Sequence, residues 1–159
     1  MSFRALLEPG RVLANVEARS KKHALDILSE LLASASDDLD QGEIFQSVIG
    51  REKLGCTAIE DGIAIPHGRL EGLERSVGAF LRLSRPIDFD APDGQPVDVM
   101  FGLLVPKAAA QAGCHLEEIT LIAEEFADRA LTSALRRATS SRSLYDLLVN
   151  HRSSSARSA

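Results

Sequence analysis

The chain has four histidines, and their neighbourhoods differ. His67 follows a short apolar run at residues 63–66 and precedes Gly68, so its imidazole stands where a buried strand breaks into a loop. Pro66 fixes the backbone before it, and the glycine leaves room for a ligand or a partner to approach. Binding and catalytic groups are common at such strand ends. Two interpretations stay open, a functional imidazole or a histidine that only caps the strand.

His115 is the second candidate. It opens a predicted helix after the loop at residues 108–113, and the unpaired amides of a helix N-terminus attract anions. The alternative is a helix-end histidine that hydrogen-bonds the backbone. His23 and His151 lie among charged or polar residues at the ends of predicted helices, so we expect both at the surface.

The sequence lacks the motifs that are typical of metal sites, serine hydrolases and nucleotide-binding enzymes. Cys56, His67, Cys114 and His115 would supply four zinc-type ligands, but no Cys-x-x-Cys or His-x-x-x-His pair is present, so we expect no metal. The sequence has no Gly-x-Ser-x-Gly elbow, which argues against a serine hydrolase. It also has no Walker-type or dinucleotide-binding glycine loop, so we expect no nucleotide cofactor.

Histidine as a nucleophile remains. A neutral imidazole, with an ordinary pKa of about 6.5, attacks a phosphoryl group at neutral pH and forms a labile phosphohistidine. Such a transfer mainly requires positioning, with cationic or N–H donors around the transferred oxygens. Arg51, at the end of a predicted helix, and the hydroxyl of Thr57 are the upstream groups able to supply them.

Several ordered blocks of the sequence resemble one known family. Residues 51–57 (REKLGCT) and 62–69 (GIAIPHGR) closely resemble the phosphorylation-site region of the enzyme IIA domains of the bacterial phosphotransferase system. The match is to the fructose/mannitol-type superfamily, and within it most closely to stand-alone nitrogen-regulatory members. Three further blocks are similar, at residues 20–25, at 95–106 and at 115–116, so the resemblance runs from about residue 5 to 150.

The resemblance implies a site and partners. His67 would accept a phosphoryl group on Nε2 from a histidine phosphocarrier protein, HPr or its nitrogen-branch paralogue. Arg51 would help hold the phosphate, His115 would hydrogen-bond in the site, and Thr57 would place a hydroxyl beside it. We expect a regulatory protein whose phosphorylation state changes its affinity for target proteins. The alternative is an enzyme IIA that passes the phosphate to a separate enzyme IIB for uptake of a fructose- or mannitol-type sugar.

Two kinds of observation bear on the choice between regulation and sugar transport: which segments accompany the domain, and where the sequence differs from the family pattern. No permease or enzyme IIB segment is attached in this chain, which favours regulation over transport. Glu60 and Asp61 precede Gly62 where the family pattern is more neutral, and this extra negative charge would either slow phosphorylation or raise its dependence on contacts with the partner. Cys56 stands where serine is common, and Arg69 where lysine is common.

The elements that would position these residues follow from periodicity. Helices are predicted from an N-cap at Ser20 to near Ala35, and over residues 44–54 with Asp40 as cap and Gly55 as stop. Strands are predicted over 77–83 and 97–105, the second buried on both faces. After Pro106 come helices over 116–126, 131–138 and 144–149, the last capped by Ser140 or Ser141. The apolar stripe of the first of these is Leu116, Ile119, Ile122, Ala123 and Phe126. This order predicts an α/β three-layer sandwich, a central mixed β-sheet flanked by helices on both faces.

Length and composition agree with one domain. The chain has 159 residues, 45% hydrophobic and 26% charged, and we expect a single domain over residues 1–152 with a disordered tail at 153–159. No stretch is long and apolar enough for a membrane span, and the N-terminus lacks a signal peptide. Two cysteines suit a reducing compartment as free thiols, so we expect a cytoplasmic protein.

The charge is unevenly spread. Residues 129–159 hold six arginines and one acid, so residues 1–128 carry a balance of −10 within a total of −5. An acidic body argues against a nucleic-acid binder and is compatible with a basic protein partner, although solubility alone would also explain it.

Overall fold

The computed structural model of the chain describes residues 3–108 and 114–151, with the side chains of Cys114 and His115 left out. In this part of the chain, five strands form one mixed sheet. The strands are β1 (Val12–Val16), β2 (Ile63–Ala64), β3 (His67–Leu70), β4 (Val77–Ile87) and β5 (Val97–Pro106). The long strands β4 and β5 are antiparallel, β1 runs parallel to β4, and both β2 and β3 run parallel to β5.

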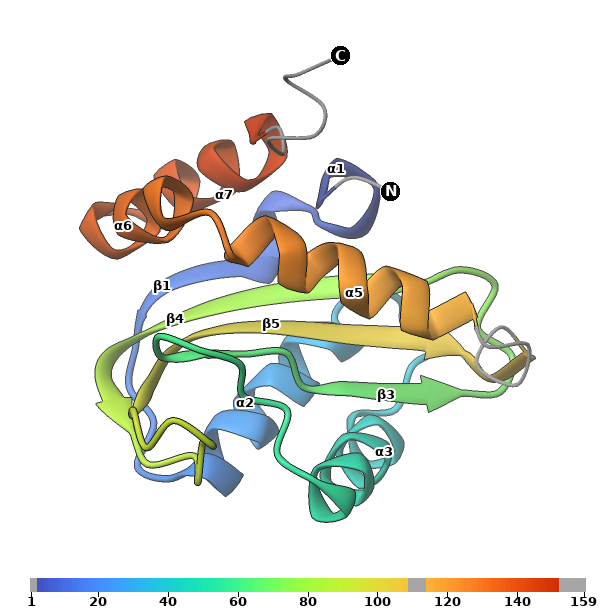
Figure 1. The fold of residues 1–159 in the computed structure, drawn as a ribbon. Coiled ribbons are helices and arrows are strands. Elements are labelled where there is room, and N and C mark those ends of the chain that lie inside the picture. The colour runs from blue at the N-terminus through green and yellow to red at the C-terminus, as the bar shows by residue number, and fades with distance from the viewer. Residues whose placement is uncertain (1–2, 109–113, 152–159) are drawn as a thin grey trace.

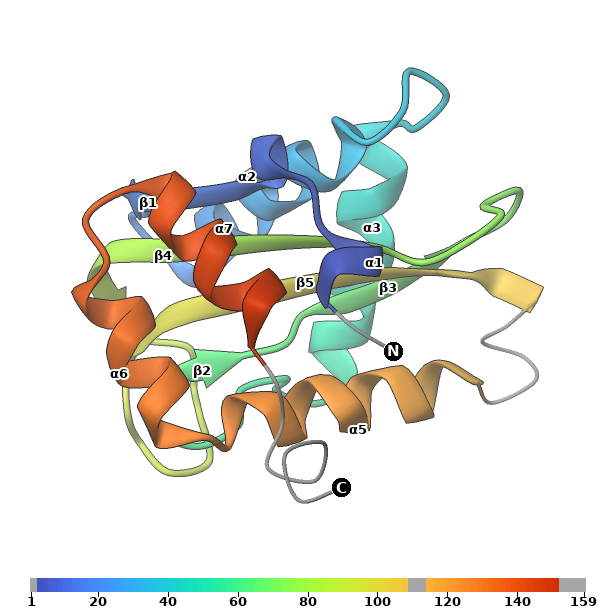
Figure 2. The ribbon, with the colours of Figure 1, turned by 90° about the horizontal axis from the view of Figure 1, so that it is seen from above.

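Helices cover both faces of this sheet (Figure 1). They are α1 (Phe3–Leu6), the short 3-10 helix η1 (Pro9–Arg11), α2 (Lys21–Ala33), α3 (Gln41–Leu54), α5 (Cys114–Phe126), α6 (Arg129–Arg137) and α7 (Ser141–Asn150). α2 and α3 lie on one face, and α1, α5, α6 and α7 on the other, as Figure 2 also shows from above. The predicted α/β three-layer sandwich is therefore confirmed.

Each face of the sheet has its own hydrophobic core. On the α5 side, the rings of Phe3, Phe101 and Phe126 all contact one another, with centroids 5.2 to 6.0 Å apart. On the α2 side, α2 packs close to β5, because Gly102 has no side chain there. A Cβ at Gly102 would lie 2.7 Å from Leu28 Cδ2, so the glycine that interrupts the apolar run of β5 allows this approach. β5 is buried on both faces, as its apolar sequence predicts.

The predicted caps begin the helices at the expected places. Ser20 accepts a hydrogen bond from the backbone N–H of His23, and Asp40 accepts one from Glu43, each at 3.1 Å. Of the two candidates at the last helix, Ser140 is the cap. α2 ends at Ala33, two residues before the predicted end near Ala35.

The start of the chain holds three elements that the periodicity analysis missed, α1, η1 and β1. All three are short, and the strand has only five residues, too few for a distinct pattern. Predicted boundaries also shift by a few residues. β4 runs on past Leu83 to Ile87 with an irregularity in its pairing, and α6 begins at Arg129 with Asp128 as its cap.

Two predictions of side-chain exposure are wrong, one of a surface residue and one of a buried residue. The side chain of His151 is 6% exposed, because Glu125 and Asp128 lie on its two ring nitrogens and draw it into the junction of α5, α6 and α7. Leu116, which was expected on the buried stripe of α5, is 60% exposed, whereas Ile122 and Phe126 are buried. Among the described side chains of α5, those that pack on the sheet core begin at Ile119.

The predicted break at Pro66 is real, but the chain does not enter a loop there. β2 pairs with the beginning of β5, and β3 resumes parallel pairing with the same strand from His67 onward. Proline has no N–H for the ladder, while its carbonyl still accepts a hydrogen bond from the N–H of Leu103 at 3.0 Å. His67 therefore opens a strand, at the edge of the sheet.

The predicted domain boundary at residue 152 and the predicted tail at 153–159 lie outside the described residues. Within the described part, no helix is both long enough and apolar enough to cross a membrane.

Candidate functional site

His67 and Arg51 come together at the end of α3. His67 is the first residue of β3, and its imidazole is half-buried beside the last turn of the helix. Arg51 donates its Nε–H to His67 Nε2 at 3.1 Å. A second hydrogen bond, from Arg51 Nη1 to the carbonyl of Gly55 at 2.9 Å, holds the guanidinium from the other side. The structure thus joins two of the four predicted site residues.

The hydrogen bonds of His67 fix its tautomer. Its Nδ1 lies 3.0 Å from the carbonyl oxygen of Ile65, which only accepts hydrogen bonds. In the neutral ring the proton is therefore on Nδ1, and Nε2 carries the lone pair that accepts the Nε–H of Arg51. The nucleophilic nitrogen is Nε2, and a cation lies beside it.

Close packing of α3 against β3 brings Arg51 within hydrogen-bonding distance of His67. Ser47 Oγ accepts the N–H of Arg69 at 2.8 Å and donates to the carbonyl of the same residue at 3.0 Å. Gly68 lies beneath this contact, and a Cβ there would be 2.8 Å from Ser47 Oγ. The glycine after the histidine is therefore needed for the approach of the helix.

An open hollow of about 530 Å³ adjoins His67. α3, β3, the end of β5 and the start of α5 line it. Its rim includes two leucines that are unusually exposed, Leu54 at 85% and Leu116 at 60%. Arg51 and Arg69 add two cations. A surface of this kind can receive a partner that presents an apolar patch together with an anion.

Thr57 hydrogen-bonds Glu52 rather than lining the hollow beside His67. Its hydroxyl donates to Glu52 Oε1, its N–H donates to Glu52 Oε2 at 2.9 Å, and it does not line the hollow. Glu52 also forms an ion pair with Lys21. Sequence reasoning missed both of these residues. One signal pointed to Glu52, because an acid in the last turn of a helix opposes the helix dipole and needs a specific partner.

His115 lies in the first turn of α5, and its side chain is outside the described part of the structure. Leu116, its neighbour in the chain, lines the hollow beside His67. The backbone therefore brings the His115 position close to the rim of the hollow.

Asp61 has cationic partners outside the hollow beside His67. Its carboxylate lies 3.6 Å from a guanidinium nitrogen of Arg129, its carbonyl accepts a hydrogen bond from Arg136, and it does not line the hollow. Glu60 is exposed and also lies outside the lining.

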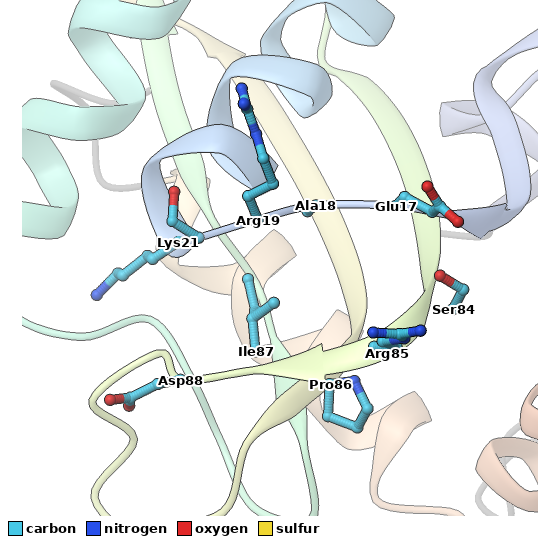
Figure 3. Close-up of a pocket in the computed structure, with 10 residues that line it drawn as sticks. Glu17, Ala18, Arg19, Lys21, Ser84, Arg85, Pro86, Ile87 and Asp88 are labelled. Atoms are coloured by element: carbon cyan, nitrogen blue, oxygen red, sulfur yellow. The ribbon is translucent and has the colours of Figure 1, made fainter.

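A larger hollow, of about 730 Å³, lies between the β1–α2 connection and the end of β4. Figure 3 shows that Arg19, Lys21 and Arg85 point in different directions around it, so these cations do not converge on one point. Among the side chains that the structure describes, no three His, Cys, Asp or Glu residues come together as metal ligands. Cys56 is a free thiol.

The fold and the site define an α/β sandwich protein with an arginine-paired histidine at an open, partly apolar surface. Residues 5–151 match the model of the EIIA 2 family of the phosphoenolpyruvate-dependent sugar phosphotransferase system, and the chain belongs to this family. It is therefore a phosphotransferase-system component, and the resemblance carried by its motifs is confirmed.

Individual relatives agree. The chain is 43% identical over 145 residues to a nitrogen regulatory protein of Pseudomonas aeruginosa, covering 91% of this chain and 93% of the relative. The crystal structure of the nitrogen regulatory protein IIA-Ntr from Neisseria meningitidis superposes with a TM-score of 0.83 at 36% identity, covering 92% of this chain and 98% of that one. The mannitol IIA of Escherichia coli shares the fold, with a TM-score of 0.74 at 21% identity over 89% of this chain and 98% of that one.

Proposed function

We propose that this chain is a phosphoryl-accepting regulatory protein of the nitrogen branch of the phosphotransferase system. An HPr-like histidine phosphocarrier phosphorylates His67, and the phosphorylation state changes the affinity of the protein for its targets. The observation that carries the proposal is the pair of hydrogen bonds on the imidazole, Nδ1 to the Ile65 carbonyl and Nε2 to Arg51.

The transfer follows from this geometry. The Nε2 lone pair attacks the phosphorus of the carrier's phosphohistidine and forms a new N–P bond. The bond from phosphorus to the carrier's ring nitrogen breaks, and its electron pair stays on that nitrogen. The proton on Nδ1 of His67 remains hydrogen-bonded to the Ile65 carbonyl, which favours the cationic ring that results. Arg51 turns its N–H donors from Nε2 to the phosphoryl oxygens.

His115 is the third member of the proposed phosphoryl site. Its position in the first turn of α5 directly precedes Leu116, which lines the hollow. The family resemblance implies that it would hydrogen-bond the phosphoryl group there. We assign Thr57 an indirect role, because its hydroxyl donates to Glu52, the residue that follows Arg51 in the chain.

Phosphorylation works as a switch through charge. The hollow beside His67 combines exposed leucines with two arginines, and a phosphoryl group adds about −2 charges in its centre. A target that binds the unmodified face by apolar and anionic groups then meets a like charge and loses affinity. The comparisons support this reading, because the nitrogen regulatory relatives are 43% and 36% identical to this chain, whereas the mannitol IIA is 21% identical.

The first test is phosphorylation in vitro. The protein is incubated with phosphoenolpyruvate, enzyme I and an HPr-like carrier, and its intact mass is measured. We expect the mass gain of one phosphoryl group in the wild type and in the control His23→Ala, whose imidazole lies at the start of α2, and none in His67→Ala. A wild type that takes no phosphate, or a phosphate that persists in His67→Ala, would overturn the proposal.

The second test separates regulation from sugar uptake. The phosphorylated protein is mixed with each enzyme IIB of its host, and the transfer of phosphate is followed. Retention of the phosphate agrees with a regulatory protein. Efficient discharge onto an enzyme IIB would instead identify an enzyme IIA that serves uptake of a fructose- or mannitol-type sugar.

A further inference from the structure

Glu52 is a buried carboxylate in an unfavourable place. Its side chain is 3% exposed, and it lies in the last turn of α3, where the partial negative charge of the helix end repels it. Burying a charge is strongly unfavourable unless partners satisfy it. A carboxylate in this position therefore requires strong hydrogen-bond and ion-pair partners. These partners identify the segments that Glu52 connects.

Three donors meet on this carboxylate. Lys21 Nζ lies 2.9 Å from Oε2, the backbone N–H of Thr57 donates to the same oxygen at 2.9 Å, and the Thr57 hydroxyl donates to Oε1. Lys21 is itself fixed, since it donates to the carbonyl of Phe89 at 3.1 Å and lies over the ring of that residue. Glu52 thus ties the first residue of α2 and the loop after α3 to the end of α3.

Two paths lead from this cluster to the histidine. The first runs through the loop at residues 55–57, because Glu52 fixes Thr57 at one end and Arg51 Nη1 donates to Gly55 at the other. The second runs through the backbone: the N–H of Ile65 donates to the Thr57 carbonyl at 3.0 Å, and the Ile65 carbonyl faces His67 Nδ1. Both hydrogen bonds that orient the site thus depend on the position of Thr57.

We infer that Glu52, together with Lys21 and Thr57, is a positioning group for the histidine site. It fixes the loop that holds the guanidinium of Arg51 and the peptide that selects the Nδ1–H tautomer of His67. The effect on phosphoryl transfer rests on the proposed function, whereas the effect on the imidazole does not.

The test removes one donor and leaves the ion pair in place. Thr57→Val keeps the size of the side chain and the backbone N–H but lacks the hydroxyl, while Thr57→Ser retains a hydroxyl. We expect Thr57→Val to slow phosphorylation by about tenfold, because a small displacement of reacting groups has large effects on rate. Its ¹⁵N imidazole shifts should move from a single Nδ1–H tautomer toward a mixture, and Thr57→Ser should restore both readouts.

A matched control separates positioning from stability. Ser29 is a buried serine on α2 whose hydroxyl donates to the Leu25 carbonyl at 2.8 Å, away from the cluster. Ser29→Ala should lower the melting temperature and leave the rate and the shifts of His67 unchanged. Glu52→Gln should act in the same direction as Thr57→Val, and if it does not fold, Thr57→Val decides alone.

A Thr57→Val protein with wild-type rate and wild-type imidazole shifts would overturn the inference. So would a change of the same size in Ser29→Ala, since the effect would then be one of stability. Failure of the wild type to accept phosphate would contradict the proposed function only, because the imidazole shifts would still decide the role of Glu52.

Discussion

At the scale of single residues, surroundings separate the chemistry of one histidine from another. His67 has a carbonyl on one ring nitrogen and an arginine on the other, which leaves a lone pair beside a cation. His151 has a carboxylate on each ring nitrogen, at 2.5 and 3.0 Å, and is held inside a helix junction. The first arrangement suits a nucleophile and the second suits a structural contact.

Arg51 offers the sharpest prediction at this scale. Arg51→Ala removes the donors beside Nε2 and should slow phosphorylation by about 100-fold, the typical effect of losing one preorganised donor to a developing anion. The melting temperature should stay near that of the wild type, because the side chain is only half-buried.

Lys53→Ala is the matched control, because this lysine is exposed on the same helical turn. It should retain the wild-type rate in a single-turnover phosphorylation assay. An unchanged rate in Arg51→Ala would remove Arg51 from the site.

At the scale of elements, the broken edge strand and the end of α3 make the site together. Pro66 interrupts the pairing with β5, which lets His67 begin a new strand whose first side chain meets the helix end. Gly68 and Ser47 then hold α3 against that strand. The site is therefore built mainly on a strand and a helix, which hold a side chain more rigidly than a loop.

Asp128 gives a prediction for the junction of α5, α6 and α7. It caps α6 and accepts a hydrogen bond from His151 Nε2, and this contact lowers the pKa of its carboxyl from the ordinary value of 3.8. Because the folded-state pKa is the lower one, the carboxylate stabilises the fold at pH values above 3.8. That stabilisation is lost as the pH falls through the folded-state pKa.

Asp128→Asn keeps an N-cap side chain and removes the charge, so it should lower the free energy of unfolding by about 1 kcal/mol at neutral pH. The difference from wild type in urea unfolding should close only below pH 3.8. Asp146→Asn, in an exposed pair with Arg142, should change little at any pH. A difference for Asp128→Asn that does not depend on pH would contradict the role of its charge.

At the scale of the whole molecule, folding redistributes the charge. The arginine-rich end of the chain and the acidic body partly neutralise each other, since Arg136 pairs with Asp98 and Arg129 lies near Asp61. The hollow beside His67 is lined by arginines although the body carries a balance of −10 over residues 1–128. The net charge of the chain therefore did not indicate the charge of the hollow beside His67.

The two cores predict where the chain can be shortened. Among the described residues, every buried apolar side chain lies between Phe3 and Leu148. A protein ending at residue 152 should therefore melt at the temperature of the full chain and accept phosphate at the same rate. A protein ending before Ser141 loses α7 with Leu144 and Leu148 and should not fold.

Thermal melting followed by circular dichroism checks both truncations. A lower melting temperature for the protein ending at residue 152 would show that the last seven residues belong to the folded domain, against the predicted boundary.

Much of the fold followed from short-range patterns. Ser20, Asp40 and Ser140 begin helices because a hydroxyl or carboxylate accepts an N–H three residues away. The apolar run of β5 predicted burial on both faces. β1 was missed because five residues carry too little periodicity, and only its pairing with β4 identifies it.

The sequence by itself determined the helix starts, the buried central strand, the break at Pro66 and the candidacy of His67 and Arg51. These depend on contacts within a few residues or on motif spacing. Only the tertiary structure decided that Nε2 of His67 faces Arg51, that Thr57 hydrogen-bonds Glu52, and that the side chain of His151 is buried. Each of these depends on atoms brought together by packing between elements far apart in the chain, and burial and hydrogen-bond partners exist only once that packing has formed.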